Sequence, residues 1–361
     1  LKTALSDLDK HGKDSLNAVA CDVTSQTNFN VTNLKKNRVG GKKPHFWDVE
    51  NLNASYAYTD QEHASPDLEY NSQKSHRGGL GYAYTTNSKP WEPFAKAKWA
   101  SSKHLQLIKD FNLYYMPKSF SFNTEMYRQI QEQKMRNKSS GLIIIKPTVA
   151  KDWDWSRNYD FRWDISKGLN FTYHATANAY IYEPSGTPET GTEEWRLNRD
   201  TVRSELGRFG SIDNFQQSVK VSYNIPVNKL PFCDWLGSTF NYTGNYRWTA
   251  NSHNLQAKLG NTASNDNTIQ FSATADLSKL YNKSTYLKNV LSAKRTNNNN
   301  KGRSKKEEEE KDKNDTVVKK KERVNVGKAV GEVGIHILCM VKKVTFSYSQ
   351  GSGVTLPGFM P

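Results

Sequence analysis

Residues 236–248 of this chain read LGSTFNYTGNYRW. Apolar and polar side chains alternate along this stretch with a period of two, which is typical of a β-strand with one apolar and one polar face. The apolar set is Leu236, Phe240, Tyr242, Tyr246 and Trp248, and the polar set is Thr239, Asn241, Thr243, Asn245 and Arg247. A second alternating stretch begins at Phe215, and a turn with two prolines joins the two. The sequence therefore predicts a long β-hairpin.

The length of this strand indicates where it lies. At about 3.4 Å per residue it would extend roughly 40 Å, whereas a globular strand usually has about five or six residues. A tilted strand crosses a bilayer with about 9 to 11 residues, and its tyrosines and tryptophan suit the aromatic girdle of a membrane barrel. We therefore expect the wall of an antiparallel transmembrane β-barrel; a large soluble β-sandwich, which uses the same alternation, is the alternative. The expected lipid-facing residues are Phe240, Tyr242, Tyr246 and Trp248, and the expected lumen-facing residues are Asn241, Thr243, Asn245 and Arg247.

The composition agrees with a water-filled barrel. Only 35% of the 361 residues are hydrophobic and the mean hydropathy is -0.81, as expected when only the lipid-facing side of each strand is apolar. The longest apolar run, residues 333–341, is too short for a spanning helix. The three cysteines, Cys21, Cys233 and Cys339, match neither a zinc pattern nor a redox pair. Because the chain begins at Leu1 without an initiator Met, we expect it to be a fragment of a longer polypeptide.

Alternation and turn residues divide the whole chain, this hairpin included, into about ten strands. The predicted domains are an irregular segment (1–45), barrel strands (46–277), a charged helical or disordered insert (278–337), and a last barrel strand with a following loop (338–361). Within the barrel region we expect strands at 46–59, 78–87, 159–165, 169–179 and 267–277, a tight hairpin over 111–126 that turns at 116–119, and a short helix near 193–206. Residues 280–294 are a further helix candidate. The charge blocks of residues 294–323 cannot bury enough apolar surface to fold, so disorder or a solvated helix is expected there.

Several separated motifs resemble one family. They are YMPKSFSF (115–122), LGR (206–208), YNIPVNKLPFCDW (223–235), VTFSY (344–348) and LPGFMP (356–361). In this order they resemble the SprA family, called Sov in some species, which is the outer-membrane translocon of the type IX secretion system of Bacteroidota and is linked to gliding motility. The resemblance extends from about residue 46 to the end of the chain. Its turn motif includes Pro226, Pro231, Asp234 and Trp235.

The resemblance implies a very large single-chain barrel in the cell outer membrane, of the roughly 36-strand class. It implies a protein-conducting channel that exports folded cargo bearing a C-terminal signal domain. The implied partners are that cargo, an outer-membrane shuttle barrel of the PorV type, a periplasmic plug protein and the lipid bilayer. No enzymatic activity, catalytic residue, metal or cofactor is implied.

Three other functions compete with this interpretation. An outer-membrane porin or substrate-specific transporter is the closest, because barrel alternation alone does not reveal what passes through. A net charge of +15 is compatible with nucleic-acid binding, but the basic residues are scattered rather than clustered. For an enzyme, Asp152 with Asp154 and Asp160 with Asp164 could be paired carboxylates, but a solvated lumen or rim face explains both pairs better.

The lengths of the connections predict which side of the membrane the insert occupies. Membrane barrels have short periplasmic turns and longer external loops. The short connections at 116–119, 166–168 and 224–235 all follow strands that run the same way, so we expect them to be periplasmic. Counting strands onward through an external loop at 251–266 puts the charged insert on the periplasmic side as well.

Overall fold

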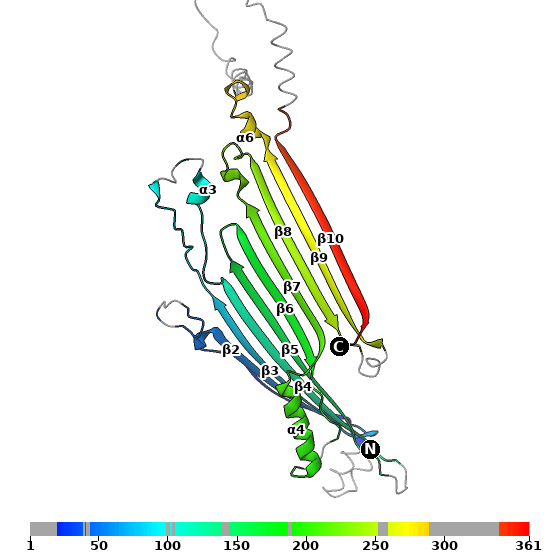
Figure 1. The fold of residues 1–361 in the computed structure, drawn as a ribbon. Coiled ribbons are helices and arrows are strands. Elements are labelled where there is room, and N and C mark those ends of the chain that lie inside the picture. The colour runs from blue at the N-terminus through cyan, green and yellow to red at the C-terminus, as the bar shows by residue number, and fades with distance from the viewer. Residues whose placement is uncertain are drawn as a thin grey trace, which may run out of the picture.

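The computed structural model describes residues 20–38, 40, 44–98, 102, 105–138, 144–186, 190–251, 259–288 and 339–360. These residues form one antiparallel sheet of ten strands, in which spatial order follows sequence order (Figure 1). The strands are β1 (Val23–Lys35), β2 (Leu52–Ala64), β3 (Leu68–Thr85), β4 (Ser119–Met135), β5 (Thr148–Asp164), β6 (Leu169–Tyr180), β7 (Ser211–Ile225), β8 (Leu236–Thr249), β9 (Asn261–Asp276) and β10 (Lys343–Phe359). The prediction of an all-β, antiparallel fold is confirmed.

The sheet is a single layer with two free edges. Each strand pairs only with its neighbours in the sequence, so β1 and β10 each leave one side unpaired within the described residues. Every residue of these two edge strands is exposed. The described sheet is therefore an open wall rather than a closed barrel.

Connections leave the sheet at two opposite ends (Figure 1). One end, which we call the α3 end, is where the chain passes from β1 to β2, β3 to β4, β5 to β6, β7 to β8 and β9 to β10, and it includes helices α3 (Gln106–Lys109) and α6 (Leu277–Tyr281). The other, the α4 end, is where the chain passes from β2 to β3, β4 to β5, β6 to β7 and β8 to β9, and it includes helix α4 (Glu193–Gly207). Short and long connections occur at both ends.

Several predicted elements have the expected form. The turn at 166–168 joins β5 to β6 as a tight hairpin, in which Ser166 and Leu169 exchange backbone hydrogen bonds of 3.2 and 3.3 Å. The helix near 193–206 is α4, which begins because the Thr192 hydroxyl accepts a hydrogen bond from the Trp195 backbone N–H at 3.2 Å. Of the helix expected over 280–294, the structure contains α6 and a helical turn at 285–288, and its last six residues lie outside the described part of the chain.

Two strand predictions are wrong. The segment 1–45 is not irregular throughout, because it contains β1. Large apolar residues are few in this strand, so its sequence shows little alternation between apolar and polar residues. The expected strand at 111–115 is absent: Leu113 alone forms an isolated bridge, to Trp91, within the long connection 86–118. Asn112 explains this, because its side chain bonds the Asp110 carbonyl and the Lys167 N–H and so holds the segment as a loop.

Several strand boundaries also differ from prediction: β2 begins at Leu52 rather than 46, β3 at Leu68 rather than 78, and β5 at Thr148 rather than 159. The expected external loop at 251–266 is shorter, since β9 already begins at Asn261, and β10 continues through most of the region expected to be a loop after it. The insert 294–323 lies outside the described residues. The chain leaves the sheet after Asp276 of β9 and re-enters it at Lys343 of β10, both at the α3 end. The periplasmic location of the insert stays a prediction, since connection length does not distinguish the two ends.

Candidate functional site

The register of the strands divides all side chains into two faces. We call one the aromatic face; it carries even-numbered residues of β2, β3, β4, β8 and β10 and odd-numbered residues of β1, β5, β6, β7 and β9, apart from short irregular stretches. The opposite face we call the polar face. Because the register is continuous through all ten strands, each face is continuous as well.

Aromatic and aliphatic side chains pair across neighbouring strands of the aromatic face. Phe122 on β4 lies opposite Tyr159 on β5, with ring centroids 5.0 Å apart. Tyr242 on β8 lies between Val221 and Ile269, and Phe271 on β9 lies between Phe240 and Tyr348. Such pairs stabilise a sheet locally, and here they extend the apolar surface from β2 to β10.

The polar face is hydrophilic across the same strands. Asn241 lies between Ser222 and Gln270, and the Asn245 amide donates to Asp266 at 2.7 Å. The register thus puts Phe240, Tyr242, Tyr246 and Trp248 on the aromatic face, and Asn241, Thr243, Asn245 and Arg247 on the polar face. That lipid covers the first set and a lumen contacts the second remains a prediction.

Between the connections at its two ends, no second layer of the described chain covers the aromatic face. Leu80 is 60% exposed, Phe346 is 59% exposed and Leu356 is 55% exposed, although all three point to the apolar side. The buried apolar residues are few: Tyr84, Ala175, Ala177, Ala179, Ile181 and Cys339. Burial of a large apolar side chain contributes about 1.5 to 3 kcal/mol, so a face of this kind is stable only against another apolar phase or partner.

At the α3 end, the β1–β2 connection folds over the edge of the aromatic face. Phe46 contacts the rings of Tyr82, Tyr84 and Phe120 at centroid distances of 5.5, 5.8 and 6.2 Å. The Tyr82 hydroxyl donates a hydrogen bond to the Phe46 carbonyl. Next to it, Trp47 is 80% exposed and stacks on His45.

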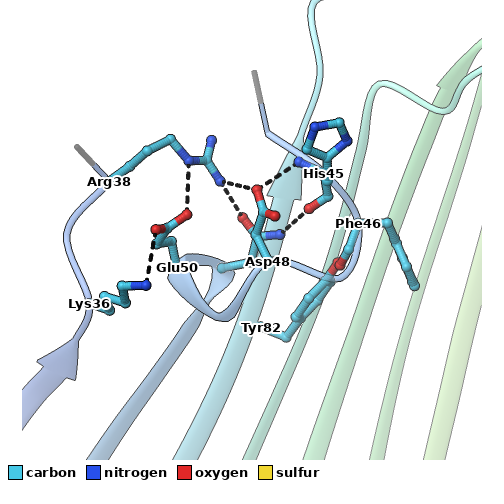
Figure 2. Close-up of polar contacts among 8 residues, drawn as sticks. Lys36, Arg38, His45, Phe46, Asp48, Glu50 and Tyr82 are labelled. Carbon is cyan, nitrogen blue, oxygen red and sulfur yellow. Dashed lines mark hydrogen bonds and ion pairs between the residues drawn. The ribbon is translucent and has the colours of Figure 1, made fainter. Parts of the chain in front are cut away.

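An arginine-centred cluster holds this connection in shape (Figure 2). Arg38 donates to Asp48 at 3.0 Å, to Asn51 at 3.2 Å and to Glu50 at 3.4 Å. Asp48 also accepts from the His45 N–H at 2.8 Å. Because one guanidinium joins three acceptors along the turn, Phe46 is held in position over the aromatic face.

At the α4 end, the β6–β7 connection covers another part of the aromatic face. Ile181 is fully buried there, and the Glu183 carboxylate accepts two hydrogen bonds from Arg128, at 2.6 and 2.9 Å, and lies 3.3 Å from Lys151. Although burial raises the pKa of the Glu183 carboxyl, hydrogen bonds and charge from Arg128 and Lys151 outweigh it and hold the pKa below its usual range. The pair partners lie 55 residues apart, so no sequence pattern indicated them.

The four residues of the family-like turn lie together in the β7–β8 connection at the α3 end. Pro226 precedes the 3-10 helix Val227–Lys229, the Trp235 indole N–H donates to the Phe232 carbonyl at 2.8 Å, and Pro231 lies between them. Asp234 forms an ion pair with Lys283, which lowers the pKa of its carboxyl. The turn therefore fastens the segment after β9, from which the insert departs.

The carboxylates weighed for catalysis lie on the polar face, and two of them, Asp160 and Asp164, form ordinary ion pairs. Asp160 contacts His174 at 2.6 Å, and Asp164 contacts Lys118 at 2.9 Å and Arg162 at 3.2 Å. Asp152 and Asp154 share that face farther along β5. In the described part of the chain, no three His, Cys, Asp or Glu side chains gather as metal ligands would. None of its helices is long and apolar enough to cross a membrane.

Comparison with protein-family models finds no matching family, and comparison with curated proteins finds no significant match. The functional argument therefore rests on the two faces of the sheet and on the sequence motifs.

Proposed function

We propose that this chain is a segment of the wall of an outer-membrane β-barrel. One observation carries the proposal: ten long strands expose an uncovered aromatic face on one side and a continuous polar face on the other. Lipid supplies the apolar phase that the aromatic face needs, and a water-filled lumen solvates the polar face. Further strands that pair with β1 and β10 would close the wall.

We further propose that the barrel is the protein-conducting channel of a type IX secretion system. The support for this step is the sequence resemblance of residues 115–122, 206–208, 223–235, 344–348 and 356–361 to the SprA family. Its cargo would be folded proteins with a C-terminal signal domain, and its partners a PorV-type shuttle barrel and a periplasmic plug. The polar face fits such cargo because it combines uncharged Asn, Ser and Thr with charges of both signs, such as Arg162 between Asp160 and Asp164.

The mixture of positive and negative side chains on the polar face argues against the nucleic-acid alternative. A protein that tracks a phosphate backbone needs clustered Lys and Arg along its groove. On the polar face, Arg247 and Lys220 are separated by uncharged residues, and Asp266 lies opposite Asn245. On the polar face of β7 to β9, therefore, no basic stripe forms.

The test is site-specific photo-crosslinking in cells that make the parent protein. A photoreactive amino acid at Asn241 is expected to capture secreted cargo, whereas the same amino acid at the adjacent Tyr242 is expected to capture lipid. Depletion of the parent protein should also trap signal-bearing cargo in the periplasm. Normal cargo export together with impaired uptake of small solutes would refute the translocon and support the transporter alternative.

A further inference from the structure

One arginine lies on the aromatic face with unsatisfied donors. Arg157 on β5 is only 6% exposed, and its neighbours across the strands are Thr124 and Ala177. Its guanidinium carbon lies 4.8 Å from the ring centroid of Trp155 and 5.6 Å from that of Phe209. Its Nε and Nη2 atoms are buried and have no hydrogen-bond partner among the described residues. Stacking stabilises the flat side of the cation but leaves these in-plane donors without acceptors.

The ring that covers Arg157 is held by an unusual helix ending. At the C-terminus of α4, the Phe209 N–H donates to the Leu206 carbonyl at 3.1 Å and the Gly210 N–H donates to the Glu205 carbonyl at 2.8 Å. This is a Schellman motif, and Phe209 occupies its left-handed position with φ 65°, where glycine is the usual residue. A phenylalanine there is conformationally costly, so its side chain is positioned over Trp155 and Arg157 at the expense of backbone strain.

The side chains around Arg157 leave an excess of positive charge. On the same face, Arg128 and Lys151 share the single carboxylate of Glu183. The next carboxylate along β4, Glu132, accepts a hydrogen bond from the Tyr70 hydroxyl at 2.6 Å. Arg157 therefore has no anion of its own among the described residues near it.

We propose that Arg157 binds the phosphate of an anionic lipid headgroup, whose acyl chains lie along the aromatic face. A guanidinium binds phosphate through two parallel N–H donors, and the unsatisfied Nε and Nη2 form such a pair. Exposed apolar side chains adjoin the site, namely Phe209 (59%) and Ile212 (40%), so a ligand with an apolar part fits better than a free anion. The headgroup requires the Phe209 ring to turn aside: the Schellman motif fixes the Phe209 backbone, whereas its ring only stacks on Trp155 and Arg157. This inference rests on the proposed membrane-wall function.

The experiment measures lipid retention by the full chain in a neutral detergent, using native mass spectrometry. The probes are phosphatidylglycerol and phosphatidylcholine with identical acyl chains. Wild type should retain phosphatidylglycerol about tenfold better, and Arg157→Met should lose most of that preference, because a charge-assisted bidentate contact is lost. Arg162→Met is the matched control: it removes an arginine from the same strand on the polar face, and its preference should equal that of wild type.

The possible outcomes distinguish failure of the proposed Arg157 lipid site from failure of the proposed membrane wall. Equal retention of both lipids by wild type would by itself refute the proposed lipid site. An unchanged preference for phosphatidylglycerol in Arg157→Met would also refute it. Competition by soluble glycerol phosphate at the concentration of the lipid would mean an anion site rather than a lipid site. Photo-crosslinking of lipid from position 242 reports on the wall independently. If lipid is captured there but no headgroup preference appears, only the Arg157 site fails, whereas absence of lipid capture refutes the membrane wall.

Discussion

Substituting arginine on each face of β8 tests the assignment of the two faces. Tyr242 lies between Val221 and Ile269 near the middle of the strand, so Tyr242→Arg puts a cation among apolar side chains that we expect to face lipid. A lipid-facing arginine near the bilayer midplane costs roughly 2 to 4 kcal/mol, which lowers the folded-to-unfolded ratio by about 30- to 700-fold. Asn241→Arg is the matched control, because Asn241 is adjacent in sequence and lies between Ser222 and Gln270 on the polar face.

The control is expected to cost little. An arginine at 241 lies diagonal to Lys220, which adds a repulsion of under about 1 kcal/mol. The assay is urea titration of the protein folded into phosphatidylcholine vesicles, followed by tryptophan fluorescence. Equal destabilisation by the two substitutions would refute the division into a lipid face and a lumen face, and a larger effect at Asn241 would reverse it.

Three further predictions concern the ends of the sheet. Arg38→Ala should accelerate amide exchange of residues 45–51 without changing exchange in β3 and β4, because the arginine joins Asp48, Glu50 and Asn51. Glu183→Gln should lower the unfolding free energy by about 2 kcal/mol at pH 7, since Arg128 and Lys151 lose their carboxylate. Because the folded pKa of Glu183 is depressed, its contribution is complete above the usual value of 4.5 and is lost as pH falls through the folded pKa, so urea midpoints of wild type and variant should converge in acid. A cysteine replacing Ser304 in intact cells should resist a membrane-impermeant maleimide until the outer membrane is permeabilised.

The parts of the fold that the sequence predicted are those determined by local pattern. Alternation over residues 236–248 predicted which residues of β8 share a face, because each side chain's face depends only on its parity within one strand. The Ser166 turn and α4 were found for the same reason: a turn residue or a helix cap acts within three or four positions of itself. Such local patterns do not indicate which residues farther apart in the sequence come into contact.

The features that the sequence did not predict depend on the position of a strand in the sheet or on tertiary packing. β10 continues past Gly351, Gly353 and Pro357, residues that weaken a strand in isolation but are tolerated at a free edge. The Arg128–Glu183–Lys151 cluster depends on the β6–β7 connection folding back over β4 and β5, which tertiary packing decides. Arg157 breaks the apolar alternation of β5, and only the position of Phe209 shows that its side chain is covered.

The predicted number of strands was correct only because one strand was missed and another was wrongly added. These two errors change which end of the sheet the first connections occupy. β1 was missed, and a strand at 111–115 was predicted that does not exist, so the directions of β2 and β3 were inverted while those of β4 to β10 were correct. The β2–β3 turn at 65–67 therefore lies at the α4 end, opposite the connection that contains Ser304. Pro66→Cys, at an exposed position of that turn, is thus the internal control for Ser304→Cys: one cysteine must react with the impermeant maleimide in intact cells and the other only after permeabilisation. Labelling of Ser304→Cys alone would mean that the α3 end is external, and labelling of both in intact cells would contradict a membrane-spanning wall altogether.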